Sequence, residues 1–68
     1  MEIFTARLAK YAIIETNTED YRAWKNAEGG FFFEVWCVEN TEWGYFDEYK
    51  LSDEDFAMLK DKAAELLG

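Results

Sequence analysis

The clearest periodic pattern lies in the last third of the chain, where apolar residues recur at helical spacing. Phe56, Leu59, Ala63, Leu66 and Leu67 fall on one side of a helical wheel, and Glu54, Met58, Asp61 and Glu65 fall nearly opposite. Ser52 is suited to the N-cap position, acidic residues follow it in the first turn, and Gly68 stands just past the end. The pattern predicts a helix from about Asp53 to Leu67.

Two segments upstream of this helix have the composition of β-strands. Residues 31–38 are dense in β-formers, and their odd positions are all apolar. The polar residues 39–42 suit a turn, so residues 43–49 are predicted to be the antiparallel partner. Gly44 in this second strand marks either a bulge or a place where a neighbouring aromatic ring covers the backbone.

The first half of the chain is less decisive. Residues 11–16 read as a further strand, which extends back to Ile3 unless residues 3–10 form a helical turn. Residues 18–28 fit a short helix through the spacing of Tyr21 and Trp24, and equally a strand through the alternation of Tyr21, Ala23 and Lys25.

These elements together predict an α+β fold. We expect a small antiparallel sheet of three to four strands packed against the C-terminal helix, with a second short helix at about 18–28 as the alternative to a strand there. The chain has no proline, no internal repeat and no low-complexity linker. Residues 1–68 are therefore expected to form a single compact domain.

Composition narrows the chemistry that such a small domain can perform. The chain has 68 residues, no histidine and a single cysteine, Cys37, which excludes an internal disulfide, a Cys/His zinc site and His-based catalysis. The strand phase puts Cys37 with Phe31, Phe33 and Val35, so we expect a buried, unreactive thiol. The 13 aromatic residues provide the rich core that a short chain needs.

Other catalytic and ligand-binding patterns are also weak. Carboxylate pairs are abundant, but 15 acidic residues on a small surface produce such pairs by chance. The acids at 47–55 lack the spacing of a calcium loop, and Gly29-Gly30 has neither the lysine nor the third glycine of a phosphate-binding loop. We expect no enzyme activity, no cofactor and no metal site, and a carboxylate-based enzyme is a distant third alternative.

Charge points to the class of partner. The net charge of −8 argues against direct binding of nucleic acid or an anionic membrane, and no apolar segment approaches the roughly 20 residues of a membrane span. Carboxylates on a rigid fold can imitate the phosphates of a nucleic acid and occupy a basic groove. We therefore predict an inhibitor or nucleic-acid mimic, of the kind encoded by phages or other mobile elements, which masks a basic nucleic-acid-handling protein.

The residues expected to bind this partner are acids on the helix and hairpin together with two tryptophans. They are Glu54, Asp61, Glu65, Glu39, Glu42, Trp36 and Trp43. The acids would steer the approach and the tryptophans would anchor the contact. The alternative role of the acids is a solvated surface that keeps the protein soluble. The single unpaired thiol and the charged N-terminus lead us to expect a cytoplasmic location.

One tract resembles a known family. The run from Tyr45 to Phe56, an acidic strand leading into a capped helix, resembles a segment of small phage inhibitors of uracil-DNA glycosylase and covers less than a fifth of the chain. The resemblance implies an acidic inhibitor, as the charge argument does.

The excess of aromatic residues supports a second functional class. Large side chains fall on both faces of the predicted hairpin, and one helix cannot cover both faces. The uncovered face is expected either to be closed by the N-terminal half of the chain or to form a homodimer. The alternative function is therefore a self-associating structural or interaction subunit whose acidity serves solubility only.

Overall fold

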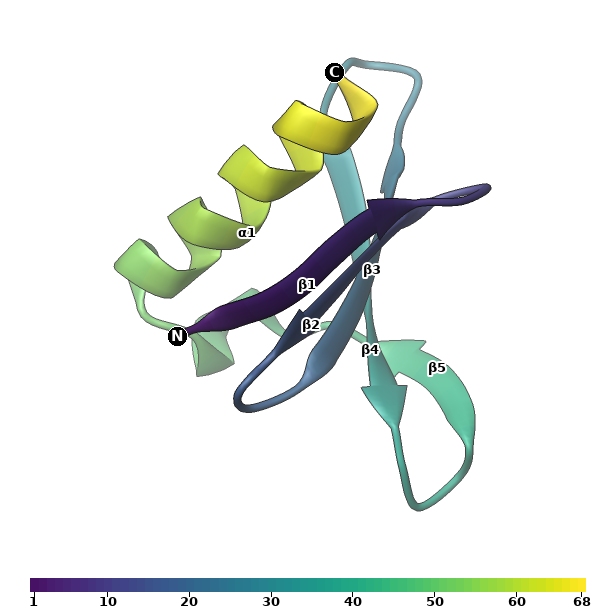
Figure 1. Ribbon diagram of the computed structural model, residues 1–68, viewed down its shortest axis with the longest axis vertical. Coiled ribbons are helices and arrows are strands. Elements are labelled where there is room, and N and C mark those ends of the chain that lie inside the picture. The colour runs from purple at the N-terminus through teal and green to yellow at the C-terminus, as the bar shows by residue number, and fades with distance from the viewer.

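The computed structural model describes residues 1–68 as a five-stranded antiparallel sheet with one long helix (Figure 1). The elements are β1 (Ile3–Leu8), β2 (Ala12–Thr16), β3 (Asp20–Lys25), β4 (Phe31–Cys37), β5 (Glu42–Tyr45), the 3-10 turn η1 (Glu48–Lys50) and α1 (Asp53–Leu67). Each strand pairs with the next one along the chain, so the spatial order is β1-β2-β3-β4-β5. Helix α1 crosses one face of the sheet over β1, β2 and β3, and the other face stays open.

The α+β class is confirmed, but the sheet has five strands instead of the expected three to four. Residues 3–8 form a strand of their own, separated from β2 by a tight turn, and do not form a helical turn. The short helix considered for 18–28 is wrong, because Asp20–Lys25 forms β3. Tyr21 and Ala23 are buried against α1 while β3 pairs with strands on both sides. A central strand pairs its backbone groups alternately with both neighbours, so all of them are satisfied, which an isolated helical turn there would not achieve.

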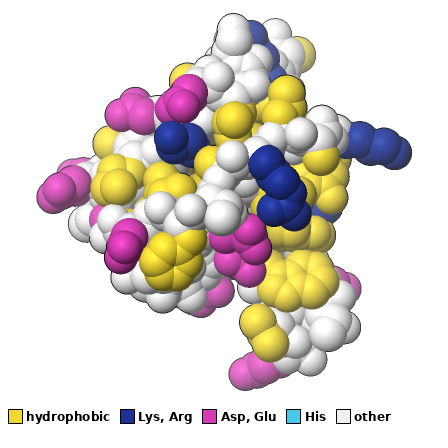
Figure 2. Space-filling model, viewed as in Figure 1, with side chains coloured by type: hydrophobic (Ala, Val, Ile, Leu, Met, Phe, Trp, Pro, Cys, Tyr) yellow, Lys and Arg dark blue, Asp and Glu magenta, His cyan; other side chains and the backbone are white.

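Helix α1 is confirmed with the predicted boundaries. The Ser52 hydroxyl accepts a hydrogen bond from the Asp55 amide at 3.1 Å, and the Gly68 amide donates to the Ala64 carbonyl at 2.8 Å. The Asp55 carboxylate binds the ammonium group of Met1 at 3.0 Å, which fastens the start of the helix to the start of β1. On the face seen in Figure 2, acidic side chains line the outer side of α1, and the projecting β4–β5 hairpin carries hydrophobic patches with acidic side chains at its tip.

The second strand of that hairpin is shorter than predicted, because the chain leaves the sheet after Tyr45. Phe46 turns under the sheet, where its ring centre lies 5.3 Å from that of Phe33 and 5.6 Å from that of Phe56. The β4–β5 register is regular, so Gly44 does not mark a bulge. A Cβ atom at Gly44 would lie 2.8 Å from the Cys37 sulfur, so it is this thiol that requires glycine, and not an aromatic ring.

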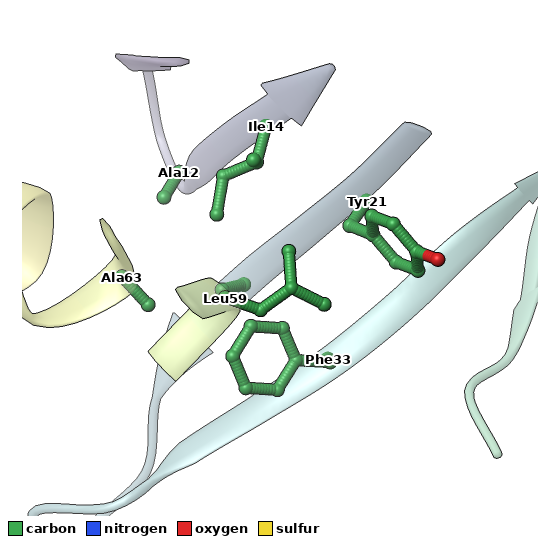
Figure 3. Packing of buried hydrophobic residues seen from close by; sticks show 7 residues of the cluster. Ala12, Ile14, Tyr21, Phe33, Leu59 and Ala63 are labelled. Atoms are coloured by element: carbon green, nitrogen blue, oxygen red, sulfur yellow. The ribbon is translucent and has the colours of Figure 1, made fainter. Parts of the chain in front are cut away.

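The core lies between α1 and the covered face of the sheet. Seven hydrophobic residues are buried there: Ala12, Ile14, Tyr21, Ala23, Phe33, Leu59 and Ala63. Figure 3 shows Leu59 reaching down from α1 between Ile14, Tyr21 and Phe33. Ile14 and Leu59 are fully buried, and each contributes about 1.5–3 kcal/mol relative to an exposed side chain. The small residues Ala12, Ala23 and Ala63 let the helix approach the sheet closely.

Candidate functional site

The open face of the sheet is organised around Arg22. Its guanidinium Nε donates to the Glu34 carboxylate at 2.7 Å, and the Trp24 indole N–H donates to the same oxygen at 3.2 Å. The guanidinium carbon lies 4.9 Å from the ring centre of Tyr11, 5.3 Å from that of Trp24 and 4.7 Å from that of Trp43. An arginine on the strand between β2 and β4 thus gathers three aromatic rings and one acid into a rigid cluster.

This cluster keeps both of its charged groups ionised. The hydrogen bond from Arg22, helped by the one from Trp24, lowers the pKa of Glu34 below its ordinary value, although partial burial acts in the opposite direction. The same hydrogen bond raises the pKa of Arg22. Arg7 and Glu15 form a second, more exposed ion pair on this face at 3.2 Å. Most charges of the open face are therefore neutralised by their neighbours.

The two tryptophans predicted to anchor a partner form a pair on the open face. Trp36 in β4 and Trp43 in β5 are directly opposite one another in the register, and their ring centres are 5.3 Å apart at 67°. Both are half-buried. Beside them, Phe32 and Tyr45 are 56% and 86% exposed, so the aromatic surface expected from the sequence is present on this side of the sheet.

Acidic residues collect at one end of the sheet. β2 and β4 run in the same direction, so the turns that follow them, 17–19 and 38–41, lie at the same end. The bond between Met1 and Asp55 brings the start of α1 to that end as well. The acids at this end include Glu2, Asp20, Glu42, Asp53 and Glu54. Arg7, Lys10 and Lys25 lie around the opposite turns together with one acid, Glu28, so charge is polarised along the strand direction.

A hollow of about 720 Å³ opens at the acidic end, between the β4–β5 hairpin and the start of α1. Its acidic lining residues are Glu19, Glu39, Asp47 and Asp55, and Lys50 is its one basic residue. Tyr21, Val35, Cys37, Val38 and Phe46 are among the apolar residues of its lining. Burial raises the pKa of the Tyr21 hydroxyl, so this group stays neutral well into the alkaline range. An acidic rim over an apolar floor suits a basic side chain with a long aliphatic stem.

The predicted site residues divide between these surfaces. Glu39 and Trp36 line the hollow, and Glu42 begins β5 at the same end. Glu54 is exposed in the first turn of α1, whereas Asp61 and Glu65 lie farther along the helix, where Lys62 binds Glu65 at 3.0 Å. The helix and the Trp36–Trp43 pair lie on opposite faces of the sheet. One flat partner surface therefore cannot contact both groups.

The sequence analysis did not predict several residues of the open face and of the hollow. Arg22 would have been found only by reading 20–25 as a strand, which places it on the same face as Glu34. Glu19, Asp47 and Asp55 carry no local signal, because they come together only when the hairpin and the helix meet. Cys37 faces the helix side as its phase predicted, but it is half-buried and lines the hollow. The hairpin projects beyond α1, so nothing covers the end of β4.

The structure and the comparisons add three negative findings. No group of three or more acidic or cysteine side chains is arranged to hold a metal ion. Helix α1 does not have the length and apolar character needed to cross a membrane. Comparison with protein-family models, with curated proteins and with solved structures found no match.

Proposed function

We propose that this protein is a non-enzymatic binding module that docks on a basic surface of a nucleic-acid-handling protein and inhibits or masks it. The single observation that carries the proposal is the polarised charge. Acids from four separate segments converge on one end of the molecule around a partly apolar hollow. Carboxylates held at fixed positions offer a basic groove the same Coulomb attraction and counterion release as a phosphate backbone.

The roles of the residues follow from their places. Glu19, Glu39 and Asp47 present the charge at the rim, and Glu42 and Glu54 extend it on either side. Trp36 links the hollow to the open face, where its pairing with Trp43 holds it in a fixed orientation. Rigid aromatic side chains lose little entropy on binding, which makes them suitable anchors.

Two matched triple variants test where the partner binds. Glu19→Gln, Glu39→Gln and Asp47→Asn remove three charges from the hollow, and Glu28→Gln, Asp61→Asn and Glu65→Gln remove three that lie away from it. Partners are captured from a lysate at low salt and their affinities are measured by calorimetry. We expect the first set to weaken binding about tenfold or more and the second set to weaken it much less. Equal losses would mean that net charge alone matters and that the hollow is not the site.

Competition tests the mimicry. A captured partner should be released by duplex DNA or by RNA, and its affinity should fall about tenfold or more between roughly 50 and 200 mM salt. Affinity that is insensitive to salt, or a partner that binds nucleic acid and this protein at the same time, would contradict the proposal.

The open sheet face favours a second candidate function, a self-associating structural subunit. Its aromatic residues are uncovered, and its Arg22–Glu34 and Arg7–Glu15 pairs leave little charge to oppose a second copy. Sedimentation equilibrium separates the candidates. A stable dimer that dissociates on Trp43→Ala and has no affinity for basic proteins would support the subunit, and a monomer that binds a basic partner would support the inhibitor.

A further inference from the structure

Strand β4 is longer than the strand beside it. β4 runs from Phe31 to Cys37, but β5 pairs only with Glu34–Cys37. Figure 1 shows β5 alongside only the last part of β4. Residues 31–33 therefore have β3 on one side and no strand on the other.

The backbone groups of Phe31 and Phe33 point into this gap. In an antiparallel ladder, successive residues direct their N–H and C=O groups alternately to the two sides. The Asn26 amide donates to the Gly30 carbonyl at 2.9 Å, which makes Phe32 and Glu34 the β4 residues that exchange hydrogen bonds with β3. Phe31 and Phe33 must face the other way, and no backbone hydrogen bond joins either of them to the chain beyond β5. Phe33 is only 6% exposed, so an unpaired amide there is unfavourable.

A second hollow, of about 430 Å³, lies at this gap. Its lining includes Phe32, Trp43 and Tyr45 from the open face and Phe33, Phe46 and Phe56 from the helix side, so it spans the edge of the sheet from one face to the other. It contains no lysine or arginine, and its two acids are Glu34, which is paired with Arg22, and Glu48. The hollow is therefore mostly aromatic with a negative balance.

We propose that this gap receives an extended segment of the partner, alternating apolar and basic residues, as an added strand beside Phe31–Phe33. Added strands gain affinity from main-chain hydrogen bonds and specificity from alternate side chains. The residue paired with Phe33 has its side chain on the helix side, against Phe46 and Phe56, and is apolar. Its neighbours lie over the rings of Phe32 and Tyr45, where lysine or arginine makes cation–π contacts.

The charge of the protein favours a segment of a partner, and not a second copy of this chain, as the strand that fills the gap. Two copies would each bring a net charge of −8 to the contact, and the other free edge, β1, has an irregular register between Ile3 and Thr5 that interrupts pairing. The basic half of this inference rests on the proposed function. The added strand rests on the backbone alone.

A short synthetic peptide alternating valine and lysine is the probe, with hydrogen exchange followed residue by residue by NMR. In the free protein the amides of Phe31 and Phe33 should exchange faster than those of Phe32 and Glu34, and the peptide should slow their exchange about tenfold or more. Methylating the valine amides should weaken binding about tenfold or more, because those amides face β4, whereas methylating the lysine amides should have little effect. Phe31→Pro removes one of the amides at the start of the strand and should weaken binding, and Phe31→Leu should not.

Each other outcome overturns a defined part of the inference. Slow exchange of the Phe31 and Phe33 amides in the free protein, or peptide binding without protection of them, would overturn the added strand. A peptide alternating valine and glutamate that binds equally well would overturn the basic segment and leave the hollow at the acidic end to be judged by its own variants. Concentration-dependent protection of the same amides without peptide would show that a second copy fills the gap.

Discussion

At the residue scale, the open face depends on one half-buried arginine of the central strand and the acid paired with it. Arg22 and Glu34 stand directly opposite each other in the β3–β4 register, and their side chains are 19% and 21% exposed. Each would be left with an unpaired charge in a mostly aromatic surrounding if the other were removed. The pair therefore specifies how three rings pack, in addition to any stability that it contributes.

Replacing Glu34 with Gln should lower the free energy of unfolding by about 1–2 kcal/mol at neutral pH. The pKa of Glu34 is lowered in the folded state, so its contribution is complete above the unfolded-state pKa and is lost as pH falls through the folded-state value. Urea unfolding across the acid range measures this, and the variant should approach the parent protein at low pH. Glu28→Gln, in an exposed turn, is the control and should change nothing. A difference between Glu34→Gln and parent that grows toward low pH would contradict the interpretation.

Gly44 gives a second prediction at this scale. The Cβ atom of Gly44→Ala would lie 2.8 Å from the Cys37 sulfur, so this variant should be destabilised by about 1–3 kcal/mol. Cys37→Ala removes the sulfur and should restore most of the loss in the double variant. Thermal unfolding of the parent protein, the two single variants and the double variant measures this double-mutant cycle. Strictly additive losses of stability would show that the clash is not the cause.

At the element scale, the limits of α1, β3 and β5 are set by different kinds of interaction. α1 has its own signals, namely a capping serine, acids in the first turn and a terminal glycine. β3 has no such local signal and is defined by pairing on both sides. β5 ends where Phe46 is needed by the core, so tertiary packing shortens a strand that local propensity would continue.

The helix cap can be tested separately. Ser52→Ala removes the acceptor for the Asp55 amide and should cost about 1 kcal/mol. Ser52→Asp supplies another acceptor and should retain most of the stability. Urea unfolding monitored by circular dichroism measures both variants. Equal destabilisation by alanine and aspartate would show that the hydroxyl has no capping role.

At the scale of the whole molecule, charge is unbalanced but organised. The chain of 68 residues has a net charge of −8. Only four of its acids form ion pairs, and one of these pairs uses the N-terminal ammonium group. We expect repulsion among the acids at the hollow to lower stability, a cost that would be retained only if the acids serve a partner. The same repulsion disfavours self-association through the acidic end.

Added salt should therefore raise the melting temperature while it weakens partner binding. Screening relieves repulsion within the folded chain and also removes attraction between the chain and a basic surface. Calorimetry of the free protein and binding measurements over the same salt series test both. Salt should raise the melting temperature of the triple variant at Glu19, Glu39 and Asp47 by less than it raises that of the parent protein. A melting temperature that falls with salt would show that the ion pairs outweigh the repulsion.

Local sequence patterns predicted much of the fold but little of the candidate site. The cap at Ser52 and the alternation of 31–37 are properties of neighbouring residues, so the sequence predicted α1 and β4 closely. Tyr21 and Trp24 fit both helical and strand spacing, and only the need for a strand between β2 and β4 decided between them. Trp36 and Trp43 were predicted as a surface because they belong to one hairpin.

The sequence by itself determined the sign of the charge, the absence of histidine chemistry, the α+β class and the position of the helix, since each depends on composition or on contacts a few residues apart. Tertiary structure alone decided that Glu19, Glu39 and Asp47 surround one hollow, that the helix acids and the tryptophans lie on opposite sides, and that β4 has a gap beside it. These features depend on strand order, strand length and the route of residues 46–52, which are settled by long-range packing that no local pattern encodes.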